Sequence, residues 1–154
     1  QQLIDDPQTR EAIVKDSVLV LDQEVSSKKG VSGLVVKGGF KVIKSLEKGR
    51  IIERLINWLL DDFVAELEPF YAQYQQIDAS ARPPLSQFLI DRTDAVTQAL
   101  LGVTDKRRER ANNKLLIKTY DKLRPQAVQH VRDSIPNVAR LLETHASLQI
   151  STPQ

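Results

Sequence analysis

The sequence predicts an all-α protein, a single compact domain of about six or seven helices, several of them kinked or broken at proline. Apolar residues recur at helical spacing along nearly the whole chain, and no segment alternates apolar and polar residues as a half-buried strand does. Turns rich in Gly, Ser or Pro separate the periodic segments. With 154 residues, 41% of them hydrophobic and 27% charged, the chain has the composition of one globular domain. We expect this domain to span residues 1–150, with a frayed tail at 151–154.

The first expected helix begins after Asp6. The Asp6 carboxylate can accept hydrogen bonds from the free amides of the first turn, and Pro7 suits the first helical position, where no N–H is needed. A buried stripe follows at helical spacing, flanked by Ile13 and Val20; its members are Val14, Val18, Leu21 and Val25. The polar run Ser-Ser-Lys-Lys-Gly at 26–30 is expected to end this helix.

A basic amphipathic helix over 31–46 has the clearest polarity in the chain. Four lysines at i, i+4, i+7 and i+11 share an arc of about 60° on a helix: Lys37, Lys41, Lys44 and Lys48. The opposite arc is apolar, with Phe40 at its edge, and collects Val31, Val35, Val36, Gly39, Val42, Ile43 and Leu46. Ser32 is the expected cap, and the helix should stop at Lys48-Gly49.

Two glycines inside this helix predict a close contact. Gly38 and Gly39 each cost about 1 kcal/mol relative to alanine in a helix interior. The approach of another backbone would explain such a cost, and Gly39 lies on the apolar side, as a contact requires. A glycine-rich phosphate loop is the sharper alternative, but no strand precedes the pair and the P-loop spacing is missing.

The longest stripe predicts a helix over about seven turns, and its members are Ile52, Ile56, Leu59, Phe63, Leu67, Phe70, Tyr74 and Ile77. Asp61-Asp62 could cap a new helix and Pro69 would kink a continuous one, so we expect one bent helix or two in close succession. Trp58 falls off the stripe, which leaves partial exposure open. A buried structural tryptophan is favoured over one that stacks on a ligand.

The remaining chain predicts a loop and further helices. Residues 78–84 form the clearest loop, because paired prolines break helices. One helix should follow, burying Leu85, Leu89, Val96, Leu100 and Val103, with the basic turn 106–110 near its end, where cations complement the helix dipole. Two stripes occupy the final third, the first being Leu116, Tyr120, Leu123 and Ala127, the second Val128, Val131, Ile135, Val138 and Leu142. Pro125 and Pro136 are expected to divide this region into about three helices.

Composition and charge exclude several kinds of function. The absence of Cys removes disulfides, thiolate chemistry and Cys-ligated zinc. The net charge of +2 is unevenly spread: residues 1–50 carry +2, residues 51–100 carry −5 and residues 101–154 carry +5. No apolar run approaches the roughly 20 residues that span a bilayer, so integral membrane association is not expected. The chain start has no basic or apolar leader segment, so we expect a cytoplasmic protein.

No catalytic, metal-binding or cofactor-binding residues are predicted, and no cofactor is expected. His145 projects to an apolar edge and His130 to the polar side, which predicts a boundary histidine and a surface histidine. Neither follows a Glu by three residues, as a di-iron helical site requires. Asp62 and Glu66 share a helix face but are expected to form a solvated acidic surface, as are Asp91 and Asp94. Nothing argues for an enzyme, although the sequence does not exclude one.

Several segments together resemble a known family. They are 27–33 (SKKGVSG), 36–41 (VKGGFK), 62–64 (DFV), 67–70 (LEPF) and the stretch from Leu123-Arg124 to Pro136-Asn137-Val138. In this order they resemble a group of short bacterial proteins, chiefly actinobacterial, classed as a domain of unknown function. The resemblance implies a stand-alone, intracellular, helical protein without an assigned activity or cofactor.

Three functions remain open. The first is a non-enzymatic helical protein that acts through protein–protein contact or self-association. The second is binding to a polyanion or anionic surface, nucleic acid or lipid headgroups, through eight cations: Lys37, Lys41, Lys44, Lys48, Lys106, Arg107, Arg108 and Arg110. The third is a small-molecule binder or an unrecognised enzyme, with a pocket between helices.

Overall fold

Residues 2–46 and 50–150, the part of the chain that this computed structural model describes, fold into seven helices. The helices are α1 (Gln2–Asp5), α2 (Pro7–Ser27), α3 (Gly30–Ser45), α4 (Ile51–Gln76), α5 (Leu85–Ile90), α6 (Thr93–Arg110) and α7 (Lys114–Ile150). No strand occurs among these residues, so the predicted all-α class is confirmed. The expected tail at 151–154 lies outside the described residues.

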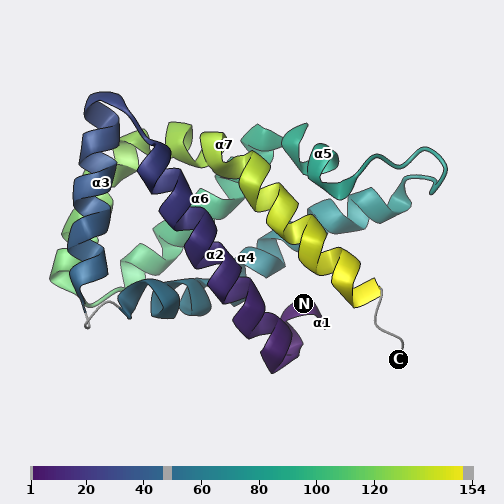
Figure 1. Ribbon diagram of the computed structural model, residues 1–154, viewed down its shortest axis with the longest axis horizontal. Helices are drawn as coiled ribbons and strands as arrows, with labels where there is room; N and C mark the ends of the chain where they lie inside the picture. The colour runs from purple at the N-terminus through teal and green to yellow at the C-terminus, as the bar shows by residue number, and fades with distance from the viewer. Residues whose placement is uncertain (1, 47–49, 151–154) are drawn as a thin grey trace.

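The longest helix, α7, is the element on which most of the others pack. It contacts α1, α2, α3, α5 and α6. Its Ile135 and Ala139 are only 0% and 1% exposed, among the most deeply buried residues described. Figure 1 shows α7 rising behind α3, crossing the top of the view and descending towards the right, so that one bent helix runs past most of the others.

The prediction that Pro125 and Pro136 divide this region into three helices is wrong. Both prolines lie inside the continuous α7. Each removes one amide donor, so the carbonyls of Asp121 and Arg132, four residues earlier, lose their helical hydrogen bond and the helix can bend. Burial of the residues beside Pro136 compensates for that loss. Pro69 likewise lies within α4. Of the two possibilities expected there, one helix or two in close succession, the structure shows the single helix.

The main core lies where α5, α6 and α7 meet the second half of α4. Its fully buried members are Leu85, Phe88, Leu89, Val96, Ile135 and Ala139. The single helix expected from Leu85 onward is wrong, because the chain breaks at Asp91 and Arg92 between α5 and α6. The Thr93 hydroxyl donates to the Ile90 carbonyl at 2.5 Å, and the Arg92 guanidinium lies 3.6 Å from the centre of the Phe88 ring. These contacts stabilise the break.

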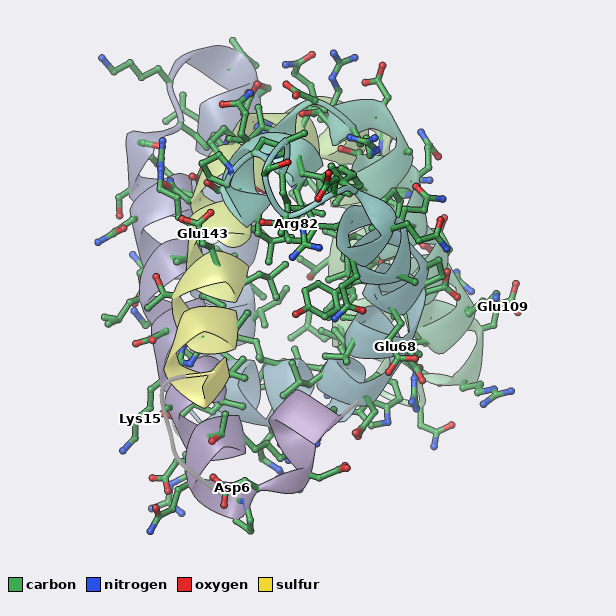
Figure 2. The ribbon with its side chains drawn as sticks, turned by 90° about the vertical axis from the view of Figure 1, so that its right-hand side faces the viewer. Asp6, Lys15, Glu68, Arg82, Glu109 and Glu143 are labelled. Carbon is green, nitrogen blue, oxygen red and sulfur yellow. The ribbon has the colours of Figure 1, made fainter. Side chains whose placement is uncertain are left out.

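Hydrogen bonds hold the loop before α5 and the start of α5 in place. Ser86 donates its backbone N–H to Glu143 of α7 at 2.6 Å, and this bond holds the pKa of Glu143 below its ordinary value. Arg82 donates to the carbonyls of Gln75 and Ile77, and its guanidinium lies 5.2 Å from the centre of the Tyr74 ring. In Figure 2, Arg82 and Glu143 lie over the body of the molecule, whereas Glu109 points outward at its edge. The loop predicted at 78–84 is confirmed.

The start of α2 is as predicted. Asp6 is the N-cap, with its carboxylate accepting from the Thr9 amide at 2.9 Å, and Pro7 takes the first position of the helix. Figure 2 shows Asp6 at the foot of the molecule. A second buried cluster of Ile4, Ile13 and Leu60 joins α1, α2 and α4.

The turn from α2 to α3 depends on two glycines. Gly30 has a φ of +75°, a conformation that glycine adopts without strain. A Cβ atom at Gly33 would lie 2.7 Å from the carbonyl carbon of Lys28, so only glycine fits there. Because α3 begins at Gly30, its N-cap is Lys29 without a side-chain capping bond, and the expected cap at Ser32 is wrong. The expected stop at Lys48-Gly49 lies outside the described residues.

A close contact does occur at Gly39, as predicted, but it is with side chains of α7 and not with another backbone. A Cβ atom there would lie 3.1 and 3.2 Å from the two methyl groups of Leu123 and 3.3 Å from Cγ2 of Thr119, both on α7. At Gly38 nothing lies within 4 Å. The rest of the predicted apolar face is only partly correct, because Val31 and Val42 are 80% and 40% exposed. Helix α3 therefore carries apolar residues on its solvent side as well.

We expect substitutions at the paired glycines to differ in sign. Gly39→Leu should overpack the contact with α7 and cost about 1–3 kcal/mol of unfolding free energy. Gly38→Ala should be neutral or stabilise by up to about 1 kcal/mol, because helix propensity improves without a clash. Urea denaturation of both variants measures the two effects. Equal effects at both positions would contradict the packing described here.

Candidate functional site

An apolar hollow lies where α3, α4, α6 and α7 meet; we call it the Trp58 hollow. It has a volume of about 160 Å³ and is open to solvent on one side. Its apolar walls include Ile43 of α3, Leu55 and Leu59 of α4, and Leu116, Ile117 and Leu123 of α7. The lining is completed by Trp58, Thr104, Arg107, Arg108, Ala111 and Tyr120.

Trp58 is the most distinctive side chain of this hollow. It lies one residue before Leu59, off the apolar stripe of α4, and is 38% exposed, so the expected buried tryptophan is wrong. The Arg107 guanidinium from the last turn of α6 lies 4.7 Å from the centre of the Trp58 ring. A cation over an indole face at this distance is favourable and orients both side chains.

Arg107 separates the Trp58 hollow from a second hollow. Its Nε donates to Asp62 of α4 at 2.6 Å, and the side chain of Asp62 is 45% exposed. Glu66 is exposed, so both carboxylates lie at the surface as expected, although Asp62 forms an ion pair. The second hollow, which we call the polar hollow, has a volume of about 240 Å³. Its lining is Asp62, Ala65, Glu66, Val103, Lys106, Arg107 and Arg110. The apolar Trp58 hollow and the polar hollow thus share Arg107 as a lining residue.

A hydrogen-bonded network fixes the wall formed by α6 and α7. The Tyr120 hydroxyl donates to Asp105 at 2.5 Å and lies 2.8 Å from the Thr104 hydroxyl, while Arg124 pairs with both Asp105 oxygens at 2.9 and 3.0 Å. Hydrogen bonds from Arg124 hold the pKa of Asp105 below its ordinary value, with a further contribution from Tyr120, while burial opposes them. Burial, and next the bond to Asp105, raises the pKa of the Tyr120 phenol. Tyr120 therefore stays a neutral donor in a fixed position.

The predicted anion-binding residues fall into different environments. Three of the eight form ion pairs: Lys44 with Asp22, Arg107 with Asp62 and Arg108 with Asp121. Four are exposed and have no ion pair within the described part of the chain: Lys37, Lys41, Lys106 and Arg110. The remaining one, Lys48, lies outside the described residues.

The lysines of α3 do not join the cations of α6 at one site. Helix α3 contributes Ile43 to the Trp58 hollow. Lys37 and Lys41 lie about 120–160° around the helix from Ile43, so their side chains leave on a different side. The two basic groups are therefore separate surfaces.

The other carboxylates singled out in the sequence lie at the surface, as expected. Asp91 and Asp94 are both exposed. Asp91 accepts a hydrogen bond from Gln87 at 2.8 Å, and Asp94 pairs with Arg132 at 3.1 Å. Among residues 2–46 and 50–150, no group of three or more His, Asp or Glu side chains is placed to hold a metal ion.

The two histidines are more buried than the sequence suggests. His145 is only 5% exposed, and its Nε2 lies 2.7 Å from Asp16 of α2. His130 was expected at the surface, and this is wrong: both ring nitrogens are shielded from solvent and neither has a hydrogen-bond partner. The local sequence around His130 gives no signal of this burial.

His130 belongs to a polar cluster between α2 and α7. Lys28 lies 3.7 Å from both Glu24 and Asp133, and Asn137 donates to Glu24 at 2.5 Å. Burial lowers the pKa of His130, the charge of Lys28 lowers it further, and Asp133 acts in the opposite direction. The cluster joins the end of α2 to α7, and His130 binds a proton less readily there than in the unfolded chain.

Comparison with known proteins gives a family but no activity. The family model described as "Family of unknown function (DUF6918)" matches residues 1–146. The chain belongs to this family. No curated protein and no solved structure matches it. No described helix combines the length and the apolar character needed to cross a membrane. The resemblance noted from the sequence is thus confirmed as far as a family of unknown function.

The lowered pKa of His130 predicts a dependence of stability on pH. Because the unfolded chain binds this proton more readily, with a pKa of about 6.5, stability should be complete above that pH and fall as the pH drops through the folded-state value. His130→Leu should remove this loss. Urea unfolding of both proteins between about pH 7.5 and about pH 5.5 measures it. Two parallel stability curves would contradict the prediction.

Proposed function

We propose that this protein is a non-enzymatic docking protein that binds an acidic segment of a partner protein, with one apolar side chain of that segment entering the Trp58 hollow. The observation that carries the proposal is the solvent-exposed Trp58 beside an apolar hollow, with Arg107 stacked on its ring. As part of the same proposal we place the protein in the bacterial cytoplasm. A small domain without cysteine supports an intracellular location.

The size of the Trp58 hollow favours a single side chain over a free ligand. Pockets for cofactors and drug-sized molecules usually measure about 300–1,000 Å³. The Trp58 hollow measures about 160 Å³, close to the roughly 150 Å³ apolar cavity that holds one benzene ring. A Phe, Leu or Ile side chain of a partner would fill it.

The composition and rigidity of the site also favour protein recognition. Residues that dominate binding energy at protein interfaces are enriched in Trp, Tyr and Arg, and all three types line this hollow. Arg107 is held by Asp62, and Tyr120 by Asp105 and Thr104. Side chains that are already ordered lose little conformational entropy on binding, so more of the contact energy appears as affinity.

The charges beside the hollow specify an acidic partner. Lys106 and Arg110 line the adjoining polar hollow and have no ion pair among the described residues. Carboxylates that follow an apolar anchor could pair with them, which would speed association and fix orientation. Glu66, also in the polar hollow, would repel a misplaced carboxylate and so add to the specificity of the register.

A peptide selection tests this proposal with a plugged hollow as the comparison. Ala111 lines the Trp58 hollow from the C-cap of α6, where its extended backbone (φ −74°, ψ 142°) accepts a large side chain, so Ala111→Phe should fill the hollow. Random peptides are displayed on phage and selected on the wild-type protein. We expect selected peptides to combine a Phe, Leu or Ile with neighbouring Asp or Glu. Since Trp58 is the sole tryptophan, its fluorescence reports their binding directly.

Matched variants make the outcome decisive. Ala81→Phe places the same side chain at an exposed alanine of the loop before α5 and should leave peptide binding unchanged. Ala111→Phe should weaken binding at least about tenfold, or about 1.4 kcal/mol, with helix content and melting temperature retained. The proposal fails if no peptide is enriched, or if peptides bind the plugged variant equally well. If the wild type is a dimer and Ala111→Phe converts it to a monomer, the partner is a second copy of this chain and not an acidic segment of another protein.

A further inference from the structure

The solvent side of α3 presents apolar and basic residues together. Val31, Leu34 and Val42 are 80%, 70% and 40% exposed. With Lys37, Gly38 and Lys41 they occupy an arc of about 140°, which we call the α3 outer face. Gly38 lies in the middle of the apolar part of this arc, between Leu34 and Val42, and the lysines lie along one edge.

The charge of this face is uncompensated. Helix α3 contains three lysines and no acidic residue. Lys44 pairs with Asp22, but Lys37 and Lys41 are exposed and form no ion pair within the described part of the chain. A partner that matches both the lysines and the exposed aliphatic groups must combine negative charge with an apolar layer.

We propose that the α3 outer face binds the surface of an anionic lipid bilayer, with α3 lying in the plane of the interface. The aliphatic side chains would enter the boundary between headgroups and acyl chains, and Lys37 and Lys41 would extend to lipid phosphates. Figure 1 shows α3 along one edge of the molecule, where a flat surface can approach it. This surface is separate from the Trp58 hollow, so the inference does not rest on the docking function.

Two observations favour lipid over other anionic partners. The two lysines could contact the phosphates of nucleic acid as well as those of lipid. The exposed aliphatic residues of this face, however, offer no aromatic surface on which a base could stack, whereas they can enter a bilayer. A protein partner would need a pocket or groove for an anchor, whereas this face is a single convex helix with glycine at its centre. The few apolar residues make the expected binding weak and reversible, and dependent on both the apolar and the basic residues.

Vesicle co-sedimentation tests the proposal. The full chain is mixed with vesicles of phosphatidylcholine alone and with vesicles that also contain phosphatidylglycerol. We expect binding only to the anionic vesicles, weakening as salt rises. The double variant Lys37→Glu/Lys41→Glu should bind at least about tenfold more weakly. The double variant Leu34→Ser/Val42→Ser should also lose binding while keeping both lysines.

A matched control and the contrary outcomes complete the test. Lys106→Glu/Arg110→Glu makes the same charge change at two exposed cations with the same spacing on α6, and should bind vesicles as the wild type does. All variants are checked for unchanged helix content and melting temperature. The proposal is overturned if the wild type does not bind anionic vesicles, or if the serine variant binds them as tightly as the wild type does. Binding of duplex DNA in place of vesicles, or a dimer lost in the same variants, would overturn it as well.

Discussion

The structure depends on one long helix that remains continuous through two prolines. Pro125 and Pro136 each remove a hydrogen bond from α7, at a typical cost of about 3 kcal/mol in a helix interior. Beside Pro136, the complete burial of Ile135 offsets much of this cost, because a fully buried Ile or Leu contributes about 1.5–3 kcal/mol. Ile135 and Ala139 on one side of α7, and Thr119 near its start, are buried against different helices. The bend lets one helix pack against several others.

The candidate site follows from this arrangement. The first half of α7 is shared between α3, through the contact of Gly39 with Leu123, and α6, through the bonds from Tyr120 and Arg124 to Asp105. Because both partners are fixed by specific contacts, neither can move to fill the space between them and α4. The space remains as the Trp58 hollow, lined by apolar groups that no other described helix covers. The same contact at Gly39 turns the α3 outer face toward solvent.

Local signals in the sequence predicted part of this structure. Asp6 and Pro7 marked the start of α2, the paired prolines marked the loop before α5, and the difference between Gly38 and Gly39 followed from helical projection. These features depend on residues within one or two turns, so a single sequence contains the necessary information. The all-α class is predictable for the same reason.

Features that depend on distant helices were not predictable. The exposure of Trp58 is decided by where α6 ends and where Arg107 projects. Part of the lowering of the pKa of His130 comes from the charge of Lys28, which follows α2 and lies about a hundred residues away in the chain. From the local sequence, a proline is expected to end a helix. That expectation does not take into account the burial against other helices that keeps α7 intact. The surroundings of His130 and Trp58 can be determined only when the packing of the helices is known.

Hydrogen exchange along α7, measured by NMR, tests most directly the claim that α7 is one cooperative helix on which the other helices pack. Amides between residues 118 and 146 should be strongly protected on both sides of Pro125 and of Pro136, with a common opening free energy close to that of global unfolding. This protection should extend past the bend without a step. Three segments bounded by Pro125 and Pro136, each opening with its own lower free energy, would contradict the account.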